Sequence, residues 1–196
     1  IGVGMNKLIL IPLLSVLVSS SYAFDNIIEL GEQLYINQCV LCHGNEGFDL
    51  SSPVIAGLKE DYIISQLNAF KPEGTRTDEL MFVMNDWAAG LNDQEIESLA
   101  KYISGLNSCD VIVPRSITAG NLLNGKRLSE ERACLECHLK SNFKIQGQKG
   151  SYLLYALDSF QNGQRKNVVM EAAVEGLAQS DIAELAKYFS SINTCQ

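Results

Sequence analysis

Histidine is scarce in this chain, which has only two histidines and one tryptophan among its 196 residues. It also has no long run of lysine or arginine, and its formal net charge is -8 at pH 7. Proteins that bind nucleic acids usually carry a basic surface, so we expect no nucleic-acid partner. An acidic surface weakly favours a positively charged protein partner. Because there are only two histidines, we expect the residues next to each one to indicate its role.

Long apolar stretches are also rare, and the main one lies near the N-terminus. Lys7 follows Met5, the apolar stretch 8–18 comes next, and small residues lead to Ala23. This order is typical of a secretory signal peptide, here residues 1–23. The apolar stretch is short for a membrane span, and a retained N-terminal anchor is the alternative. We therefore expect export to the periplasm.

Both histidines end the same five-residue motif, at 39–43 (CVLCH) and at 134–138 (CLECH). Two cysteines three positions apart, followed directly by histidine, form the attachment signature of a c-type haem. Each thiol adds across one haem vinyl group, and the histidine binds the iron. The sequence therefore predicts two covalently bound haem c groups. The expected thioether residues are Cys39, Cys42, Cys134 and Cys137, and the expected iron ligands are His43 and His138.

The alternative is a pair of redox-active or zinc-binding Cys-x-x-Cys turns. It leaves unexplained why a histidine directly follows each motif. Covalent haem attachment also fits export, because c-type haems are attached outside the cytoplasm.

The two motifs lie in repeated halves of the chain. Residues 90–104 (GLNDQEIESLAKYIS) match residues 176–190 (GLAQSDIAELAKYFS). Further upstream, Gly57, Tyr62, Leu67 and Phe70 match Gly147, Tyr152, Leu157 and Phe160. Apolar residues recur at helical spacing in both halves, so we expect an all-α fold made by duplication. The expected segments are a signal peptide 1–23, a first domain 24–110, a linker 111–118 and a second domain 119–196.

The first half should begin with a helix from Asn26 into the haem motif and end with a helix over 93–106. Gly31 lies inside the first of these helices, where glycine costs about 1 kcal/mol relative to alanine. A close crossing with the closing helix would explain it. Other helices are expected at 61–70, 121–133, 151–160 and 179–192.

A haem iron that only transfers electrons needs a second axial ligand, and methionine is the usual soft donor. No histidine is left over, so bis-histidine ligation would need another chain. Met170 is the only methionine of the second half, and Met84 holds the equivalent place in the first. We therefore expect Met84 and Met170 to bind the two irons. Met81 competes in the first half but has no counterpart in the second.

These features resemble class I cytochrome c domains, and their tandem order resembles the dihaem cytochromes c of the cytochrome c4 type. The resemblance rests on Gly31 and Tyr35 before CVLCHG, on Pro53, and on Met84 followed by GLNDQEIESLAKY. It implies an all-α fold of two tandem class I domains with two His/Met haems. It further implies a periplasmic electron carrier, with peripheral membrane association as an option, that delivers electrons to a terminal oxidase.

The second half is also similar to the haem subunit of flavocytochrome c sulfide dehydrogenase, notably over residues 147–160. In that family the dihaem chain takes electrons from a separate flavoprotein. The function that we expect is electron transfer between redox partners in a respiratory chain, without catalysis. The partner is an oxidase, a membrane cytochrome complex or, in the alternative, a flavoprotein. A haem enzyme would instead need a labile or absent sixth ligand.

Three further features extend this interpretation. Pro53 is placed to orient His43 through a backbone carbonyl, as in small c-type cytochromes, whereas the second half has no proline there. We therefore expect the two haems to differ in reduction potential. Arg76 and Arg165 occupy equivalent loops and either pair with haem propionates or are exposed charges. Cys109 and Cys195 end the closing helices and either form an interdomain disulfide or stay free.

Overall fold

The computed structural model describes residues 26–44, 52–76, 81–108, 120–139 and 144–192. Within these ranges the regular elements are helices and none is a strand, so the expected all-α fold is confirmed. None of the helices found there combines the length and apolar character needed to cross a membrane. The expected signal peptide, the linker 111–118, Cys109 and Cys195 lie outside the described residues.

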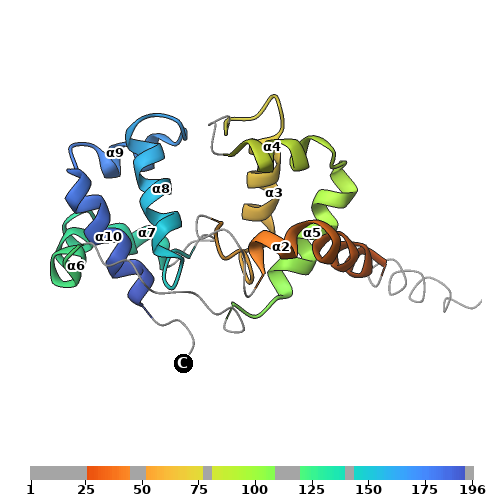
Figure 1. Ribbon diagram of the computed structural model, residues 1–196, viewed down its shortest axis with the longest axis horizontal. Coiled ribbons are helices and arrows are strands. Elements are labelled where there is room, and N and C mark those ends of the chain that lie inside the picture. The colour runs from red at the N-terminus through yellow and green to blue at the C-terminus, as the bar shows by residue number, and fades with distance from the viewer. Residues whose placement is uncertain (1–25, 45–51, 77–80, 109–119, 140–143, 193–196) are drawn as a thin grey trace, which may run out of the picture.

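The helices form two groups that repeat one plan (Figure 1). The first group contains residues 26–34, η1 (Tyr35–Cys39), α2 (Val40–His43), α3 (Glu60–Phe70), α4 (Phe82–Ala89) and α5 (Asp93–Gly105). The second contains α6 (Leu122–Glu131), α7 (Cys134–His138), α8 (Gly150–Gln161), α9 (Val168–Val174) and α10 (Gln179–Ser191). Each group encloses a hydrophobic core of its own, around Leu99 in the first and around Leu185 in the second.

The closing helices α5 and α10 begin at similar N-terminal caps. The Asn92 side chain accepts from the Glu95 backbone N–H, and the Glu95 carboxylate accepts from the Asn92 N–H. This reciprocal capping box satisfies two backbone donors that the helix leaves unpaired. In α10, Asp181 accepts from the Ala178 N–H, but Ala178 has no side-chain oxygen to return the bond.

Glycine brings the first helix of each group against its closing helix. A Cβ on Gly31 would overlap the Ser98 carbonyl, and a Cβ on Gly125 would overlap the Glu184 carbonyl. The expected close crossing at Gly31 is therefore confirmed, and the second half repeats it. These crossings hold α5 and α10 next to the helices that lead into the haem motifs.

The chain enters the two motifs differently. In the first group, the π-helix η1 runs directly into α2. In the second group α6 ends at Glu131, and Ala133 adopts a left-handed conformation (φ 52°) before Cys134. The second half has one more residue between its glycine and its first cysteine, and this turn accommodates it.

The two groups face each other, with α3 and α8 on the facing sides (Figure 1). Arg165, which follows α8, donates to Tyr62 and Gln66 of α3. An isolated antiparallel bridge also pairs the backbones of Arg76 and Arg165. The halves therefore meet along α3 and the segments that follow α3 and α8.

Candidate functional site

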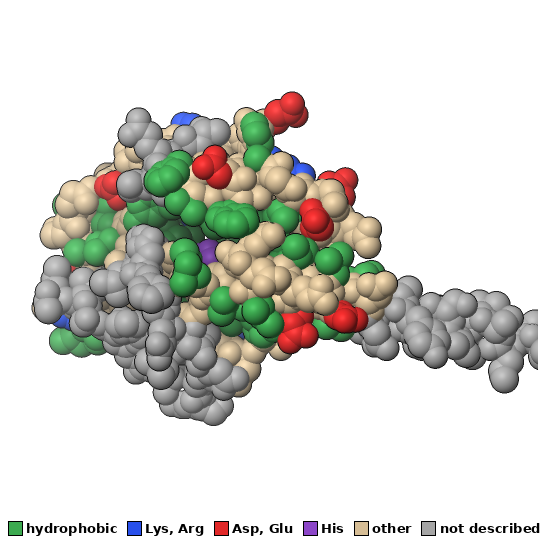
Figure 2. Space-filling view, turned by 45° about the vertical axis from the view of Figure 1, so that its right-hand side comes forward, with side chains coloured by type: hydrophobic (Ala, Val, Ile, Leu, Met, Phe, Trp, Pro, Cys, Tyr) green, Lys and Arg blue, Asp and Glu red, His purple; other side chains and the backbone are tan. Residues whose placement is uncertain are grey.

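One cavity lies between the two groups of helices and reaches both Cys-x-x-Cys-His motifs. Together with the open space at its mouth it encloses about 2350 Å³. Its lining includes Cys39, Cys42, His43, His138, Met84 and Met170. Figure 2 shows a histidine at the bottom of an opening bordered by hydrophobic side chains. A large, mainly apolar cavity with a few polar groups suits a bulky apolar ligand.

The expected thioether residues of the second motif sit differently from those of the first. Cys134 packs partly buried against the core of the second group, and Cys137 is exposed. Neither lines the cavity, although α7 carries both beside His138. The structure thus brings His138 and Met170, but neither of the two cysteines, to the wall of the shared cavity.

His43 is oriented by the backbone. Its side chain is buried, and Nδ1 lies 2.9 Å from the carbonyl oxygen of Pro53. When Nδ1 donates to this carbonyl, Nε2 is left as the ligand atom. This is the contact that the sequence predicted for Pro53. His138 is equally buried, but residues 140–143, which follow its motif, lie outside the described residues.

Met84 and Met170 occupy the same place in α4 and α9, the third residue of each helix. Both are half-buried and line the cavity. Asn85 fastens α4, because its side-chain amide donates to the carbonyls of Phe70 (2.6 Å) and Arg76 (2.7 Å). Asn167 caps α9 by accepting from the N–H groups of Val169 and Met170, both at 3.1 Å.

Met81 also lines the cavity, at the residue that caps α4. Its sulfur accepts a hydrogen bond from Arg76 Nη2 at 3.8 Å. The Met84 and Met170 sulfurs have no such bond within the described parts of the chain. This difference, together with the shared helix position, favours Met84 over Met81 as a ligand.

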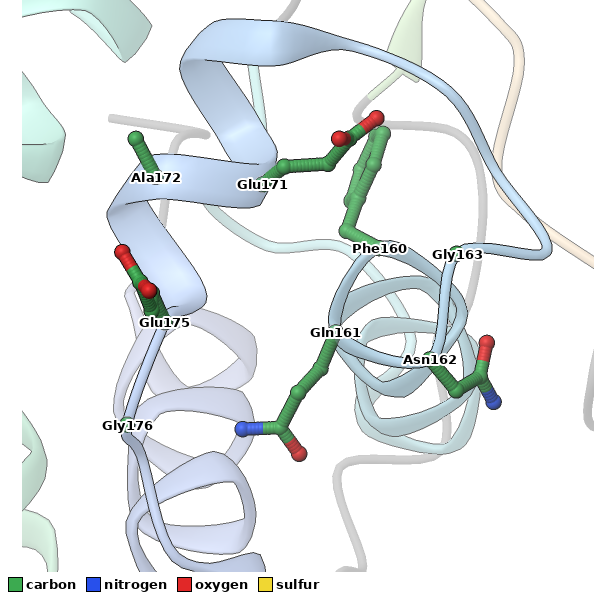
Figure 3. A pocket seen from close by; sticks show the side chains of 8 residues that line it. All are labelled: Phe160, Gln161, Asn162, Gly163, Glu171, Ala172, Glu175 and Gly176. Atoms are coloured by element: carbon green, nitrogen blue, oxygen red, sulfur yellow. The ribbon is translucent and has the colours of Figure 1, made fainter.

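A hollow between α8 and α9 is lined by the end of α8, by α9 and by the residues that follow each helix, and encloses about 870 Å³ including open solvent (Figure 3). Gln161 projects from α8 toward the segment that follows α9, and its Nε2 donates to the carbonyls of Val174 (3.1 Å) and Leu177 (2.7 Å). Glu171 also lies there and accepts from the Asn167 N–H. These bonds brace the helix that carries Met170.

Two arginines meet at the interface between the groups. Gln66 Oε1 accepts from Arg76 Nη1 at 3.0 Å and from Arg165 Nη2 at 3.1 Å, and Tyr62 accepts from Arg165 at 3.2 Å. Each guanidinium also lies over a ring, Phe70 for Arg76 and Phe160 for Arg165. Arg76 is only 5% exposed, so the alternative of an exposed loop charge is wrong for it.

Two of the four motif thiols, those of Cys39 and Cys134, have the raised pKa of a buried structural cysteine. Burial raises the pKa of Cys39 to about 11, and the neighbouring Cys42 adds to the rise. Burial likewise raises the pKa of Cys134. A redox-active Cys-x-x-Cys motif instead lowers a thiol pKa. The part of the chain that is described also contains no cluster of three or more His, Cys, Asp or Glu residues that would hold zinc.

Haem c fits these residues. The motifs supply two thiols and one imidazole each, the apolar wall suits a porphyrin, and half-buried Arg165 suits an acidic edge because the Tyr62 and Gln66 side chains that it contacts are neutral.

Comparisons with known proteins find similar chains among the cytochromes c. The cytochrome c family model matches residues 28–107. Cytochrome c-554(548) of Halomonas halodenitrificans is 34% identical over 71 residues, which cover 35% of this chain and 84% of the relative. Cytochrome c4 of Stutzerimonas stutzeri is 27% identical and aligns with 96% of this chain and 100% of the relative.

A third relative is a thiosulfate dehydrogenase electron acceptor of Stutzerimonas stutzeri, 25% identical over 79% of this chain and 78% of its own length. Among solved structures, cytochrome c4 of Acidithiobacillus ferrooxidans superposes with a TM-score of 0.70 at 25% identity, over 80% of this chain and 99% of that one.

The chain belongs to the cytochrome c family, whose members transfer electrons. Its similarity to cytochrome c4 extends over both halves, and its cofactors are two covalently bound haem c groups.

Proposed function

We propose that the protein is a periplasmic dihaem carrier that passes electrons between redox proteins without breaking a substrate bond. The observation that carries the proposal is the single cavity lined by His43 and His138 together with Met84 and Met170. Haem c, when bound, supplies a one-electron iron centre. Because one cavity serves both motifs, the two centres would lie close enough to exchange electrons inside the protein.

We assign the residues as follows. Cys39 and Cys42 attach the first haem, and His43 and Met84 bind its iron. In the second half, Cys134, Cys137, His138 and Met170 have the same roles. With two protein ligands, each iron has no open position for a substrate. The apolar wall of the cavity would keep water away from the bound irons. Fewer water molecules would then reorient with each electron transfer, which lowers its reorganisation energy.

Arg76 and Arg165 are proposed to hold the acidic edges of the haems. The Gln66 amide that both arginines contact is neutral, and a propionate would offset the cost of desolvating these positive charges. Since both arginines share Gln66, the acidic edges of the two haems would meet at the interface between the halves.

A second candidate function is that of an electron-accepting subunit within a larger oxidoreductase. It is supported by the relative named as a thiosulfate dehydrogenase electron acceptor. Large apolar side chains also flank both proposed methionine ligands on the outside, namely Phe82, Val83 and Trp87 on α4 and Val168 and Val169 on α9. A permanent subunit needs a larger and more apolar interface than a transient carrier does.

The test is an absorption spectrum of the untagged protein purified from its own host. We expect two haems per chain, an intact methionine-to-iron charge-transfer band and no flavin. Flavin that co-purifies in a fixed ratio would instead indicate the haem subunit of a flavoprotein dehydrogenase. Cell fractionation tests the proposed periplasmic location and the cleavage after residue 23.

A further inference from the structure

A chain of hydrogen bonds leads from the second half of the protein to His43. The peptide group between Pro53 and Val54 lies in its middle. The oxygen of this peptide is 2.9 Å from His43 Nδ1, and its N–H donates to Gln148 Oε1 at 2.8 Å. His43 and Gln148, which are far apart in sequence, are thus connected through one peptide group.

Gln148 uses its whole side-chain amide in this contact. Its Nε2 donates back to the Val54 carbonyl at 2.9 Å, and its Oε1 also accepts from the Lys149 N–H at 2.9 Å. The side chain is only 7% exposed, so water competes little for these bonds. The contact therefore fixes the position of the Pro53–Val54 peptide from the opposite domain.

The arrangement is not symmetrical. In the repeat that aligns Gly57 with Gly147, the position of Gln148 is occupied in the first half by Leu58. Leucine has neither a donor nor an acceptor, so Leu58 cannot make the reciprocal contact.

We propose that Gln148 is a positioning residue that sets the reduction potential of the first haem from the second domain. The inference rests on the proposed role of His43 as an iron ligand. An amide whose N–H donates a hydrogen bond becomes a better acceptor at its oxygen, because hydrogen bonds in a chain polarise one another. The Pro53 oxygen then draws the His43 Nδ1 proton more strongly and makes the imidazole more electron-rich. An electron-rich imidazole stabilises ferric iron, so Gln148 lowers the potential of the first haem.

The test is a spectroelectrochemical titration of the full-length holoprotein and three variants. Gln148→Leu removes both the donor and the acceptor and places the residue of the first half at this position. Gln148→Glu keeps an acceptor for the Val54 N–H. Gln146→Leu is the matched control, since Gln146 has the same side chain two residues away, and its buried amide makes no hydrogen bond in the described structure. A Met84→His variant identifies which titration step belongs to the first haem, because bis-histidine ligation lowers the reduction potential of that haem alone.

We expect Gln148→Leu to raise the potential of the first haem and to leave that of the second unchanged. Gln148→Glu should leave the first potential at or below its original value, and Gln146→Leu should move neither. A mere loosening of the domain interface would shift the first potential the same way in both Gln148 variants. The inference is overturned if Gln148→Leu leaves the first potential in place, or if Gln148→Glu raises it as well.

The proposed function fails in a different way. A haem missing from either motif, or no methionine band in the unaltered protein, would contradict the ligand assignment itself. If both His/Met haems are intact and the reduction potential of the first haem does not change when Gln148 is replaced, only the proposed effect of Gln148 is overturned.

Discussion

His43 Nδ1 and the carbonyl oxygen of Pro53 lie 2.9 Å apart, so the first proposed iron ligand is oriented by a proline-containing loop of its own domain. The second half has no proline at the matching place, and His138 is followed by leucine rather than glycine. Hydrogen bonding at the second ring nitrogen tunes the basicity of a ligand histidine. A redox titration of the unaltered protein should therefore resolve two midpoint potentials. Equal potentials would contradict a difference in histidine orientation.

Replacing Met84 or Met170 by alanine should remove the sixth ligand of one haem and leave the other intact. Each single variant should then lose about half of the methionine-to-iron charge-transfer band, and the double variant should lose all of it. Met81→Ala is the control, because its sulfur is occupied by Arg76. If Met81→Ala abolishes half of the band and Met84→Ala does not, the assignment in the first domain is reversed.

Alanine at Gly31 or Gly125 should destabilise the domain that contains it. The new methyl group would overlap a backbone carbonyl of the closing helix, and overpacking of this kind typically costs about 1–3 kcal/mol. Gly105 offers a matched control in a helix, because a Cβ there meets nothing within 4 Å. Gly105→Ala should be neutral or stabilise the protein by about 0.4–1 kcal/mol. Denaturant unfolding followed by far-UV circular dichroism measures all three.

Arg165→Gln should lower the potential of at least one haem, since it removes a half-buried positive charge that disfavours ferric iron. The effect should be on the order of 1 kcal/mol, typical of a charge interaction at a partly buried position. Arg127→Gln is the control, because Arg127 is exposed and forms an ion pair with Glu131 on its own helix. Unchanged potentials in Arg165→Gln would argue against a propionate at this arginine.

Tyr35 should make the stability of the first domain sensitive to alkaline pH. Burial raises the pKa of its hydroxyl above the ordinary value of 10.0, with smaller contributions from Cys39 and Tyr102. The unfolded chain ionises first as the pH rises through 10, so stability is complete below that pH and falls between 10 and the raised pKa. Tyr35→Phe should flatten this decline while losing at most about 1 kcal/mol at pH 7, since its hydrogen bond to the His43 carbonyl is long at 3.4 Å. An unchanged alkaline decline in the variant would assign it to another group.

Several features could be predicted because they depend on residues close together in the chain. The Cys-x-x-Cys-His motifs, the helix periods and the matching strings of the repeat all appear in short stretches of sequence. The crossing at Gly31 was also predictable, because an interior glycine in a helix is costly and needs a packing reason. The equivalent places of Met84 and Met170 followed from the repeat alone.

Other residues of the site were missed for a physical reason. Asn85, Gln66 and Gln161 are ordinary polar residues on helices, and only their three-dimensional neighbours show that they brace the proposed ligands. The sequence gives one indication of Gln148, because it is a polar residue where the first half has Leu58. A mismatch between repeats does not show, however, that the Gln148 side chain contacts the Val54 backbone.

Local sequence was thus sufficient for two haem-binding helical halves, since haem attachment and helix formation are short-range properties. Only tertiary structure decided three other features. Both motifs border one cavity, Arg76 lies beside Arg165, and the Gln148 side chain hydrogen-bonds to the Val54 backbone. They depend on how two domains dock, and docking is set by surface shape and hydrogen-bond geometry that no periodic pattern in the chain records.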